Sequence, residues 1–177
     1  MHRLFVAIRP PEPIRDLLID AIDESADFRW QSEDQLHLTL RFIGEVERPL
    51  ANDLADGLKR VHANRFEICI KGAGAFDRRA GGTLWAAIEP RLDVASLAAK
   101  IERVCQENGV EPEHRAFHPH ITLARWKGRR SREVRDVLER TRGLSSEPFM
   151  VAEFILFESR LSRHGAHYEP VMNYTLA

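Results

Sequence analysis

The chain has 177 residues, of which 44% are hydrophobic and 30% charged, so it can bury a core and is not compositionally disordered. Its formal net charge of −1 excludes a global basic signature for nucleic-acid binding. It contains no apolar run of about 18 residues and no secretory leader pattern, so we expect a soluble, cytoplasmic protein without membrane contact. Cys69 and Cys105 form no CxxC pair and lie in apolar stretches, which predicts buried thiols in a reducing compartment.

The first half of the chain alternates short apolar runs with helical patterns. Residues 4–8 are typical of a buried strand, and the prolines that follow end it and can open a helix. Apolar residues at i, i+3 and i+4 then predict a helix over 14–22. The next predicted elements are a strand over 36–43, a helix over 50–61, a strand over 66–70, and a bend or bulge at 72–74.

The second half shows the same order of patterns. The predicted elements are a strand over 84–88, a helix with its apolar stripe over 94–104, a strand that begins at His120, a helix over 133–144 that Ser131 can cap, and strands over 149–157 and 168–176. The length of the chain predicts one domain over residues 1–177, or two tightly fused half-domains.

The matching order indicates an internal duplication. His120 lies 83 residues after His37 (120 − 37), and Phe149 lies 83 residues after Phe66 (149 − 66). We therefore expect two interleaved lobes, with halves of roughly 1–80 and 81–177. Short strands and intervening helices predict an α+β fold with pseudo-twofold symmetry, in which two antiparallel sheets flanked by helices enclose a central groove.

One short motif occurs in each half, His37-Leu38-Thr39-Leu40 and His120-Ile121-Thr122-Leu123. Because side chains alternate along a strand, the histidine and threonine of each copy share one face and the apolar residues share the other. Pairing of the two strands across a pseudo-twofold axis predicts a cleft with His37 opposite His120. One copy alone is compatible with an ordinary strand, but two copies at matching places favour a functional site.

Two histidines and two threonines suit the cleavage of a phosphodiester without a metal. The reaction needs a base to activate the nucleophile and an acid to protonate the leaving oxygen, and imidazole serves in either state near neutral pH. Threonine hydroxyls can donate hydrogen bonds to the non-bridging phosphate oxygens. The other histidines lack the spacing of metal ligands, so we expect no metal.

The motifs and their flanks resemble the 2H phosphoesterase superfamily, and within it the bacterial RNA 2′,3′-cyclic phosphodiesterases, also called 2′-5′ RNA ligases. The similar stretches are the two motifs with Arg41 to Glu45 and Ala124-Arg125, the start Arg3-Leu4-Phe5-Val6-Ala7-Ile8-Arg9-Pro10-Pro11, and the end Gly165-Ala166-His167-Tyr168. The resemblance implies a bilobal fold and hydrolysis of RNA 2′,3′-cyclic phosphate ends to 2′-phosphomonoesters, without cofactor or obligate protein partner. It also implies His37 as proton donor, His120 as proton acceptor, and Thr39 and Thr122 as phosphate ligands.

Several further residues are candidates with an open alternative. Arg125 lies five residues after His120, so it faces the phosphate only if a twist or bulge intervenes, and otherwise it is a surface arginine. Phe42 and Trp126 could stack on a base or pack in the core. Tyr168 resembles a tyrosine near the family's groove. We expect His118 to be exposed rather than catalytic, because Pro119 interrupts regular strand pairing.

Residues 125–142 contain eight basic and three acidic residues, a local balance of +5. This stretch is either a polyanion contact or a solvated helix face. The same groove could also serve a binding module without turnover, or an esterase for small cyclic nucleotides or 2′,5′-oligonucleotides. The paired histidines favour an enzyme, and whether ligation occurs is left open by the sequence.

Overall fold

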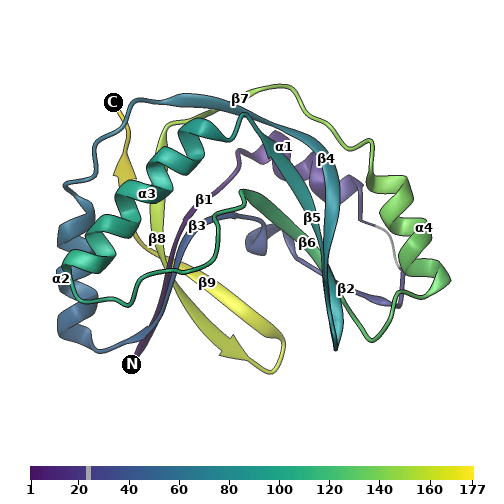
Figure 1. Cartoon of the computed structure of the whole chain (residues 1–177), viewed down its shortest axis with the longest axis horizontal. Helices are drawn as coiled ribbons and strands as arrows, with labels where there is room; N and C mark the ends of the chain where they lie inside the picture. The colour runs from purple at the N-terminus through teal and green to yellow at the C-terminus, as the bar shows by residue number, and fades with distance from the viewer. Residues whose placement is uncertain (23–24) are drawn as a thin grey trace.

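A computed structural model describes residues 1–22 and 25–177 of the chain, and its strands form an arch (Figure 1). The strands are β1 His2–Ile8, β2 Phe28–Trp30, β3 Leu38–Val46, β4 Phe66–Arg78, β5 Gly81–Glu89, β6 His120–Lys127, β7 Phe149–Val151, β8 Glu153–Ser162 and β9 Gly165–Thr175. The helices are α1 Glu12–Asp20, α2 Arg48–Leu58, α3 Leu92–Glu107 and α4 Arg132–Thr141, and a single 3₁₀ turn, η1, spans Glu33–Gln35.

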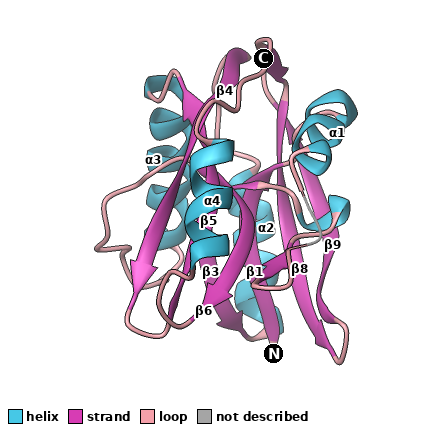
Figure 2. Cartoon of the chain, turned by 90° about the vertical axis from the view of Figure 1, so that its right-hand side faces the viewer, coloured by secondary structure: helices cyan, strands magenta, loops and turns pink. Residues whose placement is uncertain are grey.

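The strands form one antiparallel sheet in the order β7-β4-β5-β6-β3-β1-β8-β9, and β2 pairs with β6. The predicted α+β class with antiparallel strands flanked by helices is confirmed. The two predicted sheets are continuous, because β3 and β6 pair with each other at Leu38–Ile121. Helices α2 and α3 contact the half with β1 and β3, and α4 contacts β4 in the other half (Figures 1 and 2). We propose that these halves are the two lobes of the duplication.

The predicted strand over 149–157 is wrong, because the chain forms two strands there. β7 ends at Val151 and pairs with β4, whereas β8 begins at Glu153 and pairs with β1 and β9. Ala152 marks the point where the chain leaves one half of the sheet for the other. Neither half of the sheet is therefore continuous in sequence.

Strand alternation determines which residues form the core. Leu38, Leu40, Ile121 and Leu123 are buried in one hydrophobic cluster that includes residues from all four helices. A smaller cluster of Phe5, Ala7, Ile155 and Phe157, with Tyr168 against it, lies apart from that core. The motif polar residues are thus left on the face opposite the main core. Among the described residues, no helix is long and apolar enough to cross a membrane.

Candidate active site

The two His-x-Thr motifs meet at the junction of the two halves of the sheet. Leu38 pairs with Ile121 in antiparallel register. The next positions in that register place His37 across from Thr122 and Thr39 across from His120. The expected direct opposition of His37 and His120 is therefore corrected to a diagonal arrangement, because the pseudo-twofold axis passes through the apolar pair between them.

Each motif strand carries an irregularity directly after its threonine. Ala7 pairs with Thr39 and Val6 pairs with Arg41, so Leu40 between them is skipped, which means that it has no pairing partner on β1. Trp85 pairs with Thr122 and Leu84 pairs with Ala124, so Leu123 is skipped in the same way. An extra residue of this kind reverses the alternation of faces beyond it.

The reversal decides the orientation of two candidate residues. Phe42 and Arg125 each lie three residues after a motif threonine and would face away from it on a regular strand. Because Leu40 and Leu123 are skipped, both residues lie on the motif face. The bulge required for Arg125 is present, and Phe42 occupies the equivalent place in the other half.

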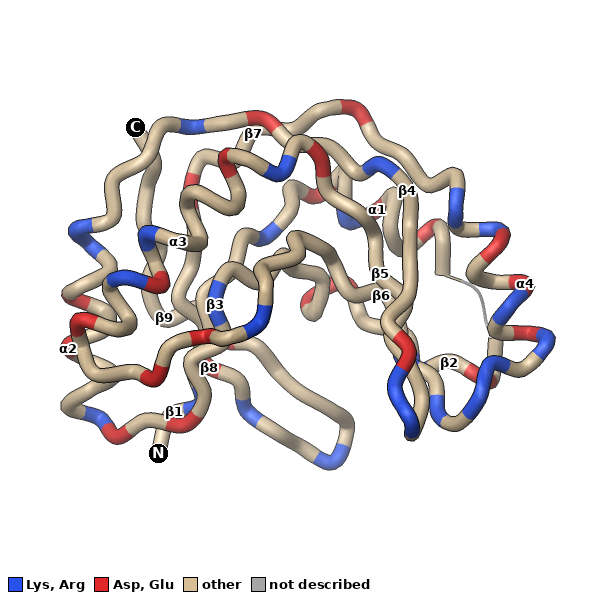
Figure 3. The backbone as a smooth tube through the Cα atoms, viewed as in Figure 1, with Lys and Arg blue, Asp and Glu red and all other residues tan. Residues whose placement is uncertain are grey.

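A groove of about 710 Å³ brings the sequence candidates together. It is lined by His37, Thr39, Phe42, His120, Thr122, Arg125 and Tyr168, which are all of the candidate site residues. Trp126 is instead buried, with its ring against Phe28. Of the basic residues in 125–142, Arg125 alone lines this groove among the described residues. Helix α4, which carries much of that stretch, lies at the edge of the molecule away from β1 and β3 (Figure 3).

A backbone carbonyl two residues upstream holds each motif histidine. The Nδ1 atom of His37 lies 2.7 Å from the Gln35 carbonyl oxygen, and Nδ1 of His120 lies 2.6 Å from the His118 carbonyl oxygen. A carbonyl can only accept, so Nδ1 is the protonated nitrogen and Nε2 of the neutral ring is an acceptor. Gln35 is itself fixed, because its Nε2 donates to the Ala166 carbonyl at 2.7 Å.

Gln35 and His118 were missed as site residues in the sequence. The signal that could have found them is their shared place two residues before each motif histidine. His118 is half-buried rather than exposed, with its ring 4.7 Å from that of Trp85. Pro119, which follows it, is buried and directly precedes β6.

Aromatic residues on the neighbouring strands pack against the two histidines in equivalent ways. The Phe5 ring lies 4.9 Å from His37, and the Trp85 ring lies 6.0 Å from His120. Phe5 lies in the middle of β1 and Trp85 in the middle of β5, and the two residues are 80 positions apart (85 − 5). Tyr168 adds an edge contact to His37 at 5.1 Å. Each imidazole is therefore restrained in orientation as well as in tautomer.

Burial changes the acid–base properties of both histidines. Burial lowers the pKa of His37 from 6.5 to about 4, against the opposing effect of the Gln35 carbonyl, and the charges of His120 and Arg125 lower it further. Burial also lowers the pKa of His120, with smaller contributions from His118 and Arg125. Both rings are therefore neutral near neutral pH until an anion enters the groove.

The groove is positively charged although the chain is not. Arg3, Arg78 and Arg125 line it, and among the described residues none of the three has a carboxylate within ion-pair distance. The lining carboxylates Glu102 and Glu113 are both paired with arginines. No cluster of His, Cys, Asp or Glu that could hold a metal ion occurs within 1–22 and 25–177. The site therefore has the electrostatics of an anion-binding pocket.

Comparison with known proteins finds one consistent group. The sequence profile of the 2′-5′ RNA ligase superfamily matches residues 10–163. An RNA 2′,3′-cyclic phosphodiesterase of Aeropyrum pernix is 34% identical over 140 residues, which are 77% of this chain and 80% of that protein. The protein of that name from Escherichia coli is 28% identical over 187 residues and covers 99% of this chain and 97% of its own length. The crystal structure of Escherichia coli LigT complexed with 3′-AMP superposes with a TM-score of 0.79 at 27% identity, covering 99% and 98% of the two chains.

Proposed function

This chain belongs to the 2′-5′ RNA ligase superfamily and is an enzyme, and from that premise we propose that it hydrolyses RNA 2′,3′-cyclic phosphodiester ends to 2′-phosphomonoesters. The observation that carries the proposal is the pair of histidines in one groove, each held by a carbonyl at Nδ1 so that Nε2 is the nitrogen left for substrate. The names of the relatives support the substrate class.

In the proposed reaction, Nε2 of neutral His120 accepts a proton from water while the water oxygen bonds to phosphorus. The bond between phosphorus and O3′ breaks, and protonated His37 gives its Nε2 proton to that oxygen. One water is consumed, and the two histidines exchange protonation states before the next turnover. General base and general acid catalysis each contribute about 10²–10⁴-fold.

Three donors in the groove suit the phosphate. Thr39, Thr122 and Arg125 line the groove, and the hydroxyls and guanidinium would hold the non-bridging oxygens as charge develops. The diagonal register gives each histidine a threonine of the other strand as its neighbour. A bound phosphate also raises the pKa of the imidazoles, which supplies the protonated His37 that the mechanism needs.

Phe42 and Tyr168 complete the proposed substrate contacts. Phe42 is 43% exposed on the motif face, where it can stack on a base. Tyr168 packs against the His37 ring, so its role in the proposal is to hold that ring. Cys105 is buried as predicted, whereas Cys69 is only partly buried. We propose that the enzyme acts in the reducing cytoplasm.

The alternative from another class is a module that binds a nucleotide or RNA end without turnover. It does not require two titratable groups with a fixed tautomer, so the site favours the enzyme. A phosphoesterase for small cyclic nucleotides or 2′,5′-oligonucleotides uses the same groove. In 2′-5′ ligation a 5′-hydroxyl would replace water as the nucleophile, the same bond between phosphorus and O3′ would break, and the reverse step would cleave the 2′-5′ linkage and regenerate the cyclic phosphate.

The test is incubation of purified protein with a 2′,3′-cyclic mononucleotide and with an oligoribonucleotide that ends in a 2′,3′-cyclic phosphate. We expect a 2′-phosphomonoester from the oligonucleotide. Binding of both substrates without product would contradict the proposal in favour of a binding module. Product from the mononucleotide alone would mean that the substrate is a small cyclic nucleotide and not an RNA end. A 3′-phosphate product would mean that O2′ and not O3′ is the leaving oxygen.

A further inference from the structure

The two halves of the sheet share a short boundary beside the two motif histidines. β1 and β3 pair at seven positions, and β5 and β6 pair at seven, but β3 and β6 pair only at Leu38–Ile121. The separation of the two motifs therefore depends on few backbone hydrogen bonds. Side chains that cross this boundary gain importance for the geometry of the site.

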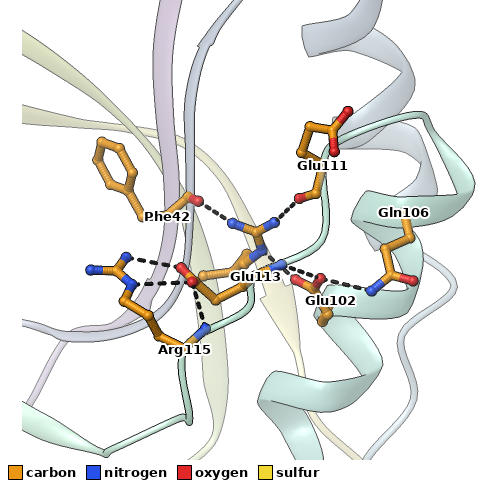
Figure 4. Close-up of polar contacts among 7 residues, drawn as sticks. Phe42, Glu102, Gln106, Glu111, Glu113 and Arg115 are labelled. Atoms are coloured by element: carbon orange, nitrogen blue, oxygen red, sulfur yellow. Dashed lines mark hydrogen bonds and ion pairs between the residues drawn. The ribbon is translucent and has the colours of Figure 1, made fainter.

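Arg41 is a buried cation on β3, three residues after the single pair that joins β3 to β6. Its side chain is 8% exposed, and its guanidinium donates to the Glu102 carboxylate of α3 and to the carbonyl oxygens of Phe42 and Glu111 (Figure 4). One side chain thus connects the first motif strand, α3 and the segment between α3 and β6. We call residues 111–117 the bridging segment.

The bridging segment is fixed by a second layer of hydrogen bonds. The Glu102 carboxylate accepts from the Glu113 backbone N–H at 3.0 Å and from Gln106 Nε2 at 2.8 Å. The Glu113 carboxylate accepts from the Arg115 backbone N–H at 3.0 Å and from its Nη2 at 2.9 Å (Figure 4). Arg41 and Glu102 therefore hold the first part of the segment in place.

The bridging segment leads directly into the second motif. Phe117 is its last residue, and His118-Pro119-His120 follow. The His118 carbonyl accepts from Nδ1 of His120. A shift of the segment would therefore move the acceptor that fixes the tautomer and orientation of His120.

Core packing does not explain a charged residue at this position. Ala124 occupies the place of Arg41 in the other half, directly after the skipped leucine, and it is fully buried. Its cross-strand partner Leu84 is buried, as is Val6 opposite Arg41. A buried ion pair gains little stability over apolar packing, because desolvation offsets its attraction.

We propose that Arg41 is a positioning residue, which with Glu102 anchors the bridging segment and so holds His120 in productive register with His37. The inference rests on the proposed function for its catalytic readout. We expect the effect in the chemical step, because Arg41, although it lines the groove, directs three of its five N–H groups to protein acceptors.

The test compares wild type with Arg41→Met, Arg41→Lys and Glu102→Gln. Methionine keeps the apolar stem and removes the guanidinium. We expect kcat on a cyclic-phosphate substrate to fall about tenfold or more while KM stays within about threefold, since misplacement by about 1 Å can lower a rate about 10²-fold. Lysine should restore part of kcat. Imidazole ¹⁵N NMR should show that neutral His120 loses its preference for the Nδ1–H tautomer in Arg41→Met.

Arg60→Met is the matched control, because Arg60 pairs with Glu107 of α3 at 3.6 Å and does not line the groove. It should leave kcat and the His120 tautomer unchanged. A folded Arg41→Met protein with wild-type kcat and tautomer would overturn the proposal. If Arg41→Met does not fold, wild-type values in Arg41→Lys and Glu102→Gln would overturn it equally. An inactive wild type would contradict the proposed function, and the NMR comparison would still test the positioning role.

Discussion

At the scale of single residues, the site depends on how two imidazoles are held. Each donates its Nδ1 proton to a backbone carbonyl, and each packs on an aromatic residue of the adjacent strand. The same ring can then be a base when neutral or an acid when protonated. Environment alone must make the two roles different.

The first prediction concerns removal of either imidazole. His37→Ala and His120→Ala should each lower kcat/KM by at least about 10²-fold, because each removes one proton transfer. The cleavage assay should be run beside a thermal melt of each variant. His62→Ala is the control, since His62 is exposed and outside the groove. Wild-type turnover in either motif variant would remove the two-histidine mechanism.

The second prediction concerns the pH dependence of kcat/KM. The productive free enzyme has protonated His37 and neutral His120, and burial lowers both pKa values, that of His37 to about 4. The profile should therefore be bell-shaped with its maximum below neutral pH. His37→Ala should lose the alkaline limb and His120→Ala the acidic limb. Loss of the opposite limbs would mean that donor and acceptor are reversed.

At the scale of elements, the groove depends on bulges and on close contacts between neighbouring strands. The Trp85 ring supports His120 and His118 from β5, and it lies over Gly74 of the neighbouring strand β4. A Cβ atom at Gly74 would be 2.5 Å from Cη2 of Trp85. The glycine thus provides the space that lets the indole reach the site.

The third prediction is that Gly74→Ala displaces Trp85 and disturbs His120. We expect kcat/KM to fall about tenfold and stability to fall by about 1–3 kcal/mol, because the indole must leave its place to accommodate the new Cβ atom. Steady-state kinetics and urea denaturation measure the two effects. Gly143→Ala is the control, since a Cβ atom there would meet nothing within 4 Å. Equal behaviour of the two variants would show that Trp85 does not support the site.

At the scale of the whole molecule, acid–base equilibria of the site are linked to folding. The pKa of His37 in the folded protein lies below its ordinary value of 6.5. Between pH 6.5 and about 4, the unfolded state therefore binds more protons at this position than the folded state does. This contribution to stability is present above pH 6.5 and is lost as pH falls.

The fourth prediction is that the free energy of unfolding decreases between pH 7.5 and 5, and decreases less in His37→Asn. This range lies above the region where Glu102 and Glu113 become protonated, because both carboxyls have pKa values below 4.5. Urea denaturation at the two pH values measures the change. His62→Asn should behave as wild type, and an equal slope in His37→Asn would contradict burial of a neutral His37.

The fifth prediction is that turnover survives an excess of EDTA. The described residues contain no cluster that could hold a metal ion, and the proposed proton transfers need none. Cleavage of a cyclic-phosphate substrate should be measured before and after dialysis against the chelator. Loss of activity, followed by recovery with one added metal, would show that the site has been misassigned.

The sequence by itself determined the parts of this protein that depend on local periodicity. The 83-residue offset of the motifs, the shared face of His37 and Thr39, and most elements follow from side-chain spacing. The cap of α4 also follows, since Ser131 Oγ accepts from the Val134 N–H at 3.1 Å. These features need only the neighbouring residues of the chain.

Tertiary structure decided where the candidate side chains point. Arg125 and Phe42 reach the motif face because Leu123 and Leu40 are skipped, and a bulge is set by the partner strand rather than by its own sequence. The diagonal register and the break at Ala152 also depend on residues distant in the chain. The alternation of side chains predicts which face a residue occupies only within one regular strand. Beyond a bulge, the pairing with the neighbouring strand decides the face.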